Sequence, residues 1–344
     1  MRKFWNGKVS RRGLIGGAAV TGAALPVLHE LVPHQGLHDQ AATAAEHKAR
    51  ARAAHRGSGH LGAVGSVDPR ANGFDPHEIV RDFDEGIVRG GVRQWELVAE
   101  DREIEVAPGV RYAAWTYNGR VPGPTLRARE GERLRIRFVN GSSHPHTIHF
   151  HGIHRDMMDG IPGVGPGNIA PGESTVYEFD ATPFGLHLYH CHSTPLSEHI
   201  AKGLYGAFVI DPRRGRAPAD ELVMVMNGFD TNFDRSNEIY AVNTVAFAYM
   251  DSPIRVKRGE LVRIYLVNAL EFDPLNSFHV HANFFDYYPT GTRLEPRDFT
   301  DTVIQGQGER GILELRFPYT GKYMFHAHVS EFAELGWMGF FEVV

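Results

Sequence analysis

A long internal repeat is the feature of this 344-residue sequence that most constrains its fold. The segment GERLRIRFVN at residues 131–140 recurs as GELVRIYLVN at residues 259–268. Both segments alternate polar and apolar residues, which is the pattern of a strand with one buried face. Two His-x-His pairs follow each segment, at 149/151 and 190/192 and again at 279/281 and 326/328. Because equivalent positions lie about 130 residues apart, the sequence predicts one β-domain present twice in tandem.

The composition agrees with a chain built from short strands and many turns. It contains 38 Gly and 20 Pro, and 11% of its residues are aromatic. We therefore predict an all-β fold with two tandem β-sandwich domains and no long amphipathic helix. The repeat places the first domain at residues 75–213 and the second at residues 218–344. The segment DPRRGRAP at residues 211–218 is the predicted linker.

The first 74 residues read differently from the repeat. A basic start, the pair Arg11-Arg12 and a mild apolar stretch at residues 16–28 describe an export signal that resembles the twin-arginine type. The apolar stretch contains glycines and a proline and is too short to span a membrane. We assign residues 1–45 to the signal and its leader and residues 46–74 to a flexible segment. The protein is then expected in the periplasm or outside the cell.

Four His-x-His pairs supply eight imidazoles to the two repeats. On an extended strand, both members of such a pair point to the same face. Imidazole is a common ligand of transition metals, and buried imidazoles without a metal need other hydrogen-bond partners. Four pairs at equivalent positions therefore favour a multinuclear copper centre over simple packing. The eight residues are His149, His151, His190, His192, His279, His281, His326 and His328.

The single cysteine predicts a second kind of metal site. Cys191 lies between His190 and His192, so its side chain points to the opposite face of the strand. His146 and His199 complete a set of two histidines and one thiolate, which is the composition of an electron-transfer copper site. The alternative is a buried cysteine in a strand that happens to be rich in histidine.

A weak axial methionine often completes such a site, but this chain has Leu204 after His199. Leucine cannot coordinate, so we predict a three-coordinate copper with a raised reduction potential. The second repeat has Ala327 in place of the cysteine and Asn276 in place of His146. The electron-transfer site is therefore expected in the first domain alone.

These motifs resemble the multicopper oxidases, which are laccase-like enzymes built from cupredoxin domains. The residues that carry the resemblance are the pattern HxxHxHG at 146–152, HCH at 190–192 and HxxxGL at 199–204. The chain is most similar to two-domain laccases whose type 1 copper lies in the first domain. The resemblance implies four copper ions per chain. It assigns the type 1 copper to His146, Cys191 and His199 with Leu204 as a non-coordinating axial residue, the type 2 copper to His149 and His279, and the type 3 pair to His151, His190, His192, His281, His326 and His328.

Two acidic residues are candidates for supplying protons. Asp159, in the sequence MDG at 158–160, resembles the acidic residue that this family places near its type 2 copper. We interpret it as a proton relay, with a turn-forming aspartate beside Gly160 as the alternative. Glu331, three residues after His328, is a second relay candidate.

The resemblance implies a laccase-like oxidase that couples one-electron oxidation of a phenolic or similar donor near His199 to reduction of O2 to water. A copper nitrite reductase is the first alternative, because residues 193–198, between Cys191 and His199, resemble the loop of those enzymes more than the shorter loop of laccases. A copper nitrite reductase needs only three histidines, at a mononuclear site. A metallo-oxidase of Cu(I), Fe(II) or Mn(II) would need carboxylates near His199, where Glu198 is adjacent. A copper carrier would leave the eight histidines unused.

The remaining expectations concern partners. A net charge of −5 gives no sign of a nucleic-acid partner. Each domain supplies half of the eight histidines, so a shared cluster must lie between a first and a second domain. Two-domain relatives form a ring of three chains with clusters shared between neighbours, and we predict such a homotrimer here.

Overall fold

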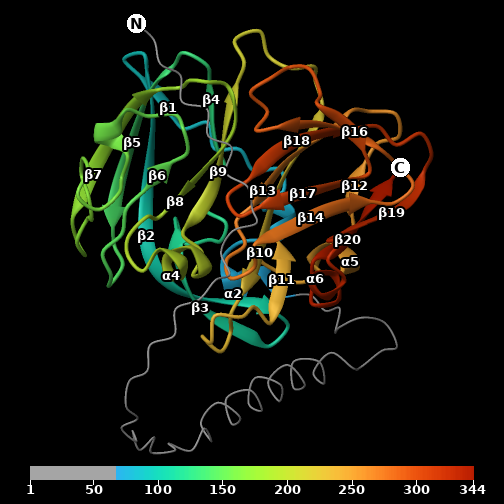
Figure 1. Ribbon diagram of the computed structural model, residues 1–344, viewed down its shortest axis with the longest axis horizontal. Helices are drawn as coiled ribbons and strands as arrows, with labels where there is room; N and C mark the ends of the chain where they lie inside the picture. The colour runs from blue at the N-terminus through green and yellow to red at the C-terminus, as the bar shows by residue number, and fades with distance from the viewer. Residues whose placement is uncertain (1–66) are drawn as a thin grey trace, which may run out of the picture. The chain divides into compact units, whose positions relative to one another are not determined.

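The computed structural model describes residues 67–344 (Figure 1). The predicted export signal and leader, residues 1–45, and the segment up to residue 66 lie outside the described residues. The described residues begin earlier than the boundary expected at residue 75. Helix α2 (Pro69–Asn72) precedes helix α3 (Pro76–Ile79), and the Asn72 amide exchanges two hydrogen bonds with the backbone of Glu105. Among these residues, no helix is long and apolar enough to cross a bilayer.

Two sheets are formed by strands that precede residue 213. In the first, the order is β1-β2-β5-β7, and β3 also pairs with β2; in the second, it is β4-β9-β8-β6. Strand β5 shows why these sheets have an inner and an outer face, since Leu134, Ile136 and Phe138 are buried while the arginines between them are exposed. The strands are β1 (Ile87–Arg89), β2 (Val92–Ala107), β3 (Val110–Tyr117), β4 (Leu126–Arg129), β5 (Arg133–Asn140), β6 (His149–Phe150), β7 (Ser174–Asp180), β8 (Gly185–His190) and β9 (Tyr205–Asp211).

Two further sheets are formed by strands that follow residue 218. Their orders are β11-β10-β13-β18-β15-β16 and β12-β20-β19-β14-β17. The strands are β10 (Asp220–Phe229), β11 (Ile239–Val242), β12 (Ile254–Val256), β13 (Val262–Asn268), β14 (Leu275–Val280), β15 (Phe285–Pro289), β16 (Asp298–Thr300), β17 (Thr302–Gly306), β18 (Arg310–Leu315), β19 (Gly321–His326) and β20 (Met338–Val343).

The two halves repeat one connectivity, which confirms the predicted all-β, cupredoxin-like class. The parallel pair β2–β5 corresponds to β10–β13, and the parallel pair β4–β9 corresponds to β12–β20. Strands β6 and β8, which carry the first histidines, correspond to β14 and β19. The helices are short: 3-10 helix η1 (Asp156–Met158), α4 (Leu196–Ala201), α5 (Ala248–Asp251) and α6 (Ser330–Glu334).

Strand β13 departs from its predicted half-buried pattern. All seven of its residues are buried, whereas its counterpart β5 alternates. The reason is that one apolar cluster joins the halves and places Tyr265 and Val267 of β13 with Leu186, Leu188 and Val209 of the first half. The sheet that contains β13 is thus covered on both faces. The two halves are packed against each other and are also joined by the linker.

Candidate metal centre

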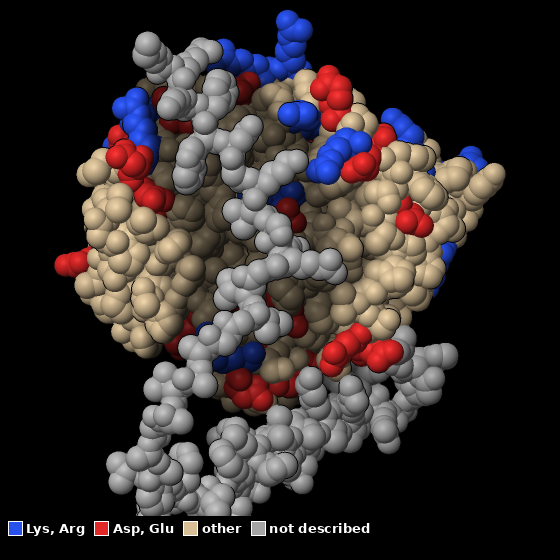
Figure 2. Space-filling model, in the orientation of Figure 1, with Lys and Arg blue, Asp and Glu red and all other residues tan. Residues whose placement is uncertain are grey.

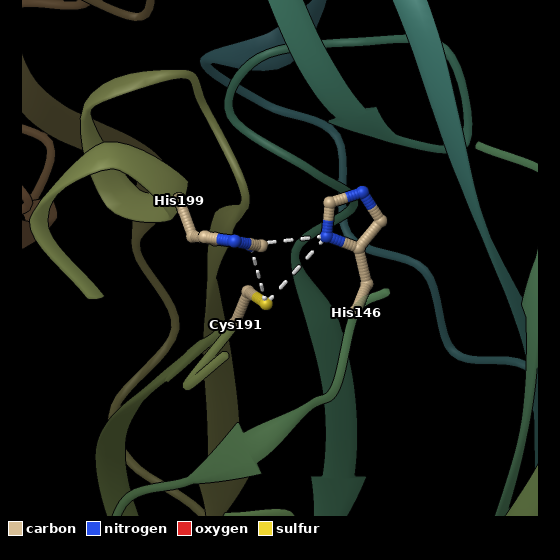
Figure 3. Close-up of side chains that lie close together, drawn as sticks. All are labelled: His146, Cys191 and His199. Atoms are coloured by element: carbon tan, nitrogen blue, oxygen red, sulfur yellow. Dashed lines mark hydrogen bonds between the residues drawn. The ribbon is translucent and has the colours of Figure 1, made fainter. Parts of the chain in front are cut away.

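Three side chains converge in the first half, as Figure 3 shows. Cys191 follows β8, His199 belongs to α4, and His146 makes an isolated bridge with Ile169 just before β6. The Cys191 Sγ lies 3.2 Å from His199 Nδ1 and 3.8 Å from His146 Nδ1, and the two Nδ1 atoms are 3.1 Å apart. All three residues are buried. These three residues, called the trigonal group below, are the set of two histidines and one cysteine that the sequence predicted. His146 lies in an isolated β-bridge and not in the expected strand.

Hydrogen bonds around this trigonal group leave one nitrogen of His146 free. Ser142 Oγ donates to Asp101 Oδ1 at 2.6 Å and lies 2.9 Å from His146 Nε2. A serine hydroxyl has one hydrogen, so Nε2 donates to Oγ and Nδ1 keeps its lone pair. Burial lowers the pKa of His146 to about 3, with the neighbouring His199 as a smaller cause. The imidazole is therefore neutral, as a metal ligand must be.

A backbone N–H group and apolar neighbours surround the Cys191 thiol. The Thr147 N–H points to the Cys191 Sγ at 3.4 Å, and burial raises the pKa of the Cys191 thiol. Leu204 is fully buried in the same apolar cluster as Cys191, and its carbonyl accepts the Cys191 N–H. The Trp115 ring packs on both imidazoles, with centroid distances of 5.1 Å to His146 and 4.7 Å to His199. A metal here would be shielded from water.

The four histidines at 149, 151, 190 and 192 lie together at the end of β6 and β8. His149 and His190 are directly paired across the two strands, and His151 Nε2 lies 2.9 Å from His190 Nε2. Ligand atoms of His149, His151 and His190 all fall within 4.8 Å of one another. His192 lies beside them, with its ring centroid 5.4 Å from that of His149. Burial is the main cause that lowers the pKa of His151 to about 2 and of His190 to about 4.

The second half repeats this arrangement contact by contact. His279 pairs with His326 across β14 and β19, and His281 Nε2 lies 3.0 Å from His326 Nε2. Ligand atoms of these three residues again lie within 4.8 Å. The His328 ring centroid is 5.3 Å from that of His279. His190 Nδ1 and His326 Nδ1 each lie within 2.8 Å of the carbonyl of the next residue, which leaves Nε2 of both free for a metal.

In the described chain, each triad of converging histidines draws its members from one half only. A cavity of about 310 Å³ borders the first set, and its second-half wall is formed by residues 268–271, Gln307 and Gly308, with none of the second-half histidines. The two sets of one chain therefore face different surroundings.

Asp159 touches the histidine set, as its sequence context suggested. Its Oδ1 and its carbonyl oxygen lie 2.7 Å and 2.9 Å from His149 Nδ1. Glu331 is exposed in the first turn of α6. Sequence reasoning missed Asp301, whose carbonyl contacts His279 Nδ1 at 2.9 Å as that of Asp159 contacts His149. It also set aside His154, whose Nε2 is 3.5 Å from Asp159 Oδ1. No common spacing links Asp159 and Asp301 to their histidines, so the repeat could not identify the second one.

The second half has filled the place of the trigonal group. Ala327 donates its N–H to the Trp337 carbonyl as Cys191 donates to that of Leu204, so Trp337 is the counterpart of Leu204. By the same backbone bonds, Phe332 on α6 is the counterpart of His199, and Tyr240 stacks on it at 4.0 Å where Trp115 packs on His199. Apolar side chains thus occupy the positions that Cys191 and His199 hold in the first half.

The donor sets fit copper. A thiolate with two Nδ1 atoms suits an electron-transfer copper, and groups of imidazole nitrogens without carboxylates suit further copper ions. The tautomers of His146, His190 and His326, fixed by the hydrogen bonds above, leave the inward nitrogen of each ring available.

Comparison with known proteins agrees with this chemistry. Two family models, both described as multicopper oxidase, match residues 99–215 and 216–344. A solved structure described as a crystal structure of a multicopper oxidase is 62% identical, covers 81% of this chain and 100% of that chain, and has a TM-score of 0.79. The copper-containing nitrite reductase of Neisseria meningitidis serogroup B is 29% identical over 296 residues, which is 79% of this chain and 72% of that protein.

A shorter match is found to Laccase-2 of Botryotinia fuckeliana, which is 40% identical over 136 residues, 38% of this chain and 22% of that protein. The chain thus resembles both oxidases and nitrite reductases. Because the family models cover both halves and the donor sets fit copper, the chain belongs to the multicopper oxidase family and is a copper-binding oxidoreductase of cupredoxin fold.

Proposed function

We propose that this protein is a laccase-like oxidase that takes electrons one at a time from a small donor and reduces O2 to water. The observation that carries the proposal is that both histidine sets are complete and match contact by contact. Bound copper would supply one-electron redox chemistry at the trigonal group and O2 reduction at the histidine sets. The backbone at Cys191 joins the two directly, because its neighbours His190 and His192 belong to the first set.

Nitrite reduction is the second candidate, favoured by the resemblance to copper-containing nitrite reductases. It needs a mononuclear site with three histidines, which would leave most of the eight without a role. The test is copper content and acceptor use of the copper-loaded protein, with Cys191→Ser as the control that lacks the trigonal thiolate. About four copper ions per chain and O2 uptake with a phenol support the oxidase. About two copper ions and nitrite-dependent oxidation would make it a nitrite reductase.

The separation of the two sets supports a ring of chains in which a first half meets a second half of its neighbour. His281 and His328 are exposed at the outer face of the sheet formed by β14, β17 and β19. On that face Ile304, opposite Ser277 in the register, is 65% exposed, an unusual state for a large apolar residue. Figure 2 shows few charged side chains over β14 and β17. We propose a homotrimer in which the first set of one chain covers this face of the next.

The donor is proposed to bind beside α4, where a cavity of about 250 Å³ opens. Glu198 and Lys202 line it from the helix, and Tyr112 and the exposed Phe233 form a stacked aromatic pair, 6.0 Å apart. Lys202 Nζ lies over the rings of both Phe233 and Trp115, the latter in contact with His199. Aromatic walls suit a planar phenolic donor.

A metal-ion donor is less well supported. Oxygens of Asp230, Asp234 and Glu238 do gather near this cavity. However, Asp230 accepts the N–H groups of residues 234 and 235, and Glu238 accepts the Thr231 N–H and O–H. These carboxylates therefore organise their own loop.

Export by a twin-arginine route remains our proposal for residues 1–45. Replacing Arg11 and Arg12 with lysine should retain the protein inside the cell. Equal amounts of wild type and variant outside the cytoplasm would contradict it.

A further inference from the structure

A chain of hydrogen bonds reaches the trigonal group from the protein surface. The Asp101 carboxylate, at the surface on β2, accepts the Ser142 O–H at 2.6 Å and the Ser143 N–H at 2.8 Å. Ser142 is 4% exposed, and its Oγ lies 2.9 Å from His146 Nε2 and 3.3 Å from the N–H of His144. With its one hydrogen given to Asp101, Oγ is left with two lone pairs for those two N–H groups. Every hydrogen-bonding position of the hydroxyl is used.

We propose that Asp101 and Ser142 are positioning residues for His146. They hold its imidazole as the tautomer with the proton on Nε2, keep Nδ1 directed at the metal, and pass negative charge to that ligand. The inference rests on the electron-transfer role proposed for the trigonal group. A more electron-rich ligand stabilises the oxidised metal, so the Asp101–Ser142 pair lowers the reduction potential of the bound copper. This opposes the effect of Leu204, which raises the potential because it replaces a coordinating methionine.

The second half of the molecule provides an internal comparison. Gly141 donates its N–H to the Ala99 carbonyl, and Ala269 donates to that of Met226; residues 142 and 270 each donate to the asparagine two positions earlier. By these bonds, Leu270 is the counterpart of Ser142 and Gly228 that of Asp101. His146 corresponds to Asn276.

The second half, which has no cysteine, therefore lacks counterparts of Asp101 and Ser142 as well as of His146. A Cβ at Gly228 would lie 2.6 Å from Leu270 Cδ1, so a carboxylate has no room there. The polar pair is present only where a histidine ligand needs it. A role in folding alone would not explain this difference, because both halves make the same backbone bonds at this turn.

The test compares Ser142→Ala, Asp101→Asn and the rescue variant Ser142→Thr with Glu103→Gln. Glu103 is an exposed carboxylate on the same strand, paired with Arg111, and serves as the matched control. In metal-free protein, nitrogen NMR of His146, identified by its loss in His146→Gln, reports the tautomer. We expect a single Nε2–H form in wild type, the control and Ser142→Thr, and a mixture in Ser142→Ala.

In copper-loaded protein, two further quantities are measured: the reduction potential, from redox titration of the blue absorption band of copper at the trigonal group, and the copper affinity. We expect a higher reduction potential in Asp101→Asn and roughly tenfold weaker copper binding in Ser142→Ala. Wild-type tautomer in Ser142→Ala, or potentials equal to that of Glu103→Gln, would overturn the inference. If wild type gave no blue band, the proposed function would fail, and the NMR comparison would still decide the role of Ser142.

Discussion

Asp159 contacts His149 at Nδ1, through both its carboxylate and its carbonyl oxygen. Its carboxylate is placed to exchange a proton next to the O2-reducing centre proposed above. Asp159→Asn keeps the backbone contact to His149 Nδ1 and removes only the carboxylate. We expect turnover to fall about 100-fold with KM for the donor unchanged. Steady-state O2 uptake across pH measures this, and wild-type turnover at every pH would exclude the relay.

His187 is buried between two carbonyl oxygens, those of His151 and Pro183. Burial is the main cause that lowers its pKa from 6.5 to about 4. The unfolded chain therefore takes up a proton at higher pH than the folded one. The stability that His187 contributes is fully present above pH 6.5 and is lost as the pH falls toward 4.

We expect this residue to account for about 3 kcal/mol of the stability that the metal-free protein loses between pH 7.5 and pH 4. Urea unfolding at the two pH values, for wild type and His187→Gln, gives the difference. The variant should be less stable at pH 7.5 but less sensitive to acid. An equal acid loss in both proteins would assign the sensitivity to other groups.

At the level of elements, strand periodicity was enough to place most of the candidate ligands. Alternation put His190 and His192 on the face opposite Cys191, and the repeat matched β6 and β8 to β14 and β19. Periodicity says nothing about side chains in turns. Ser142 lies in a turn and Asp301 between two strands. Asp101 lies on β2, but its partner Ser142 is 41 residues away in sequence, so pattern reasoning found none of the three. The two-sided burial of β13 was missed because it depends on packing between the halves.

Helix α4 presents three faces to three environments. Ser197, Glu198, Ala201 and Lys202 line the proposed donor cavity, while Leu196 and Ile200 line the cavity beside the first histidine set. His199 points to the trigonal group. Phe233, which precedes β11, is 58% exposed and lines the donor cavity.

Phe233→Ala should therefore weaken donor binding without altering the copper site. We expect KM for aromatic donors to rise about fivefold, since stacking of one ring contributes about 1 kcal/mol. The blue absorption band and its potential should stay at wild-type values. Unchanged KM for a series of phenols would place the donor elsewhere.

At the scale of the whole molecule, the proposed ring can be tested by mixing two inactive proteins. His151→Ala disables the first set and His281→Ala the second. In a ring, the first half of a His281→Ala chain can meet the second half of a His151→Ala neighbour and form an intact cluster. Random mixing should restore about a quarter of wild-type activity. Refolding the two variants together and measuring O2 uptake tests this, and no recovery would mean that each cluster forms within one chain.

The separation of the two histidine sets also predicts the order in which the blue colour and the oxidase activity develop during copper loading. All ligands of the trigonal group belong to one half of one chain, so a single chain can acquire its blue colour alone. In the proposed ring, the histidine sets form the proposed oxygen-reducing centre only after chains have assembled. During copper reconstitution, colour should therefore develop at a rate independent of protein concentration, and oxidase activity should follow after a lag that shortens as the protein is concentrated.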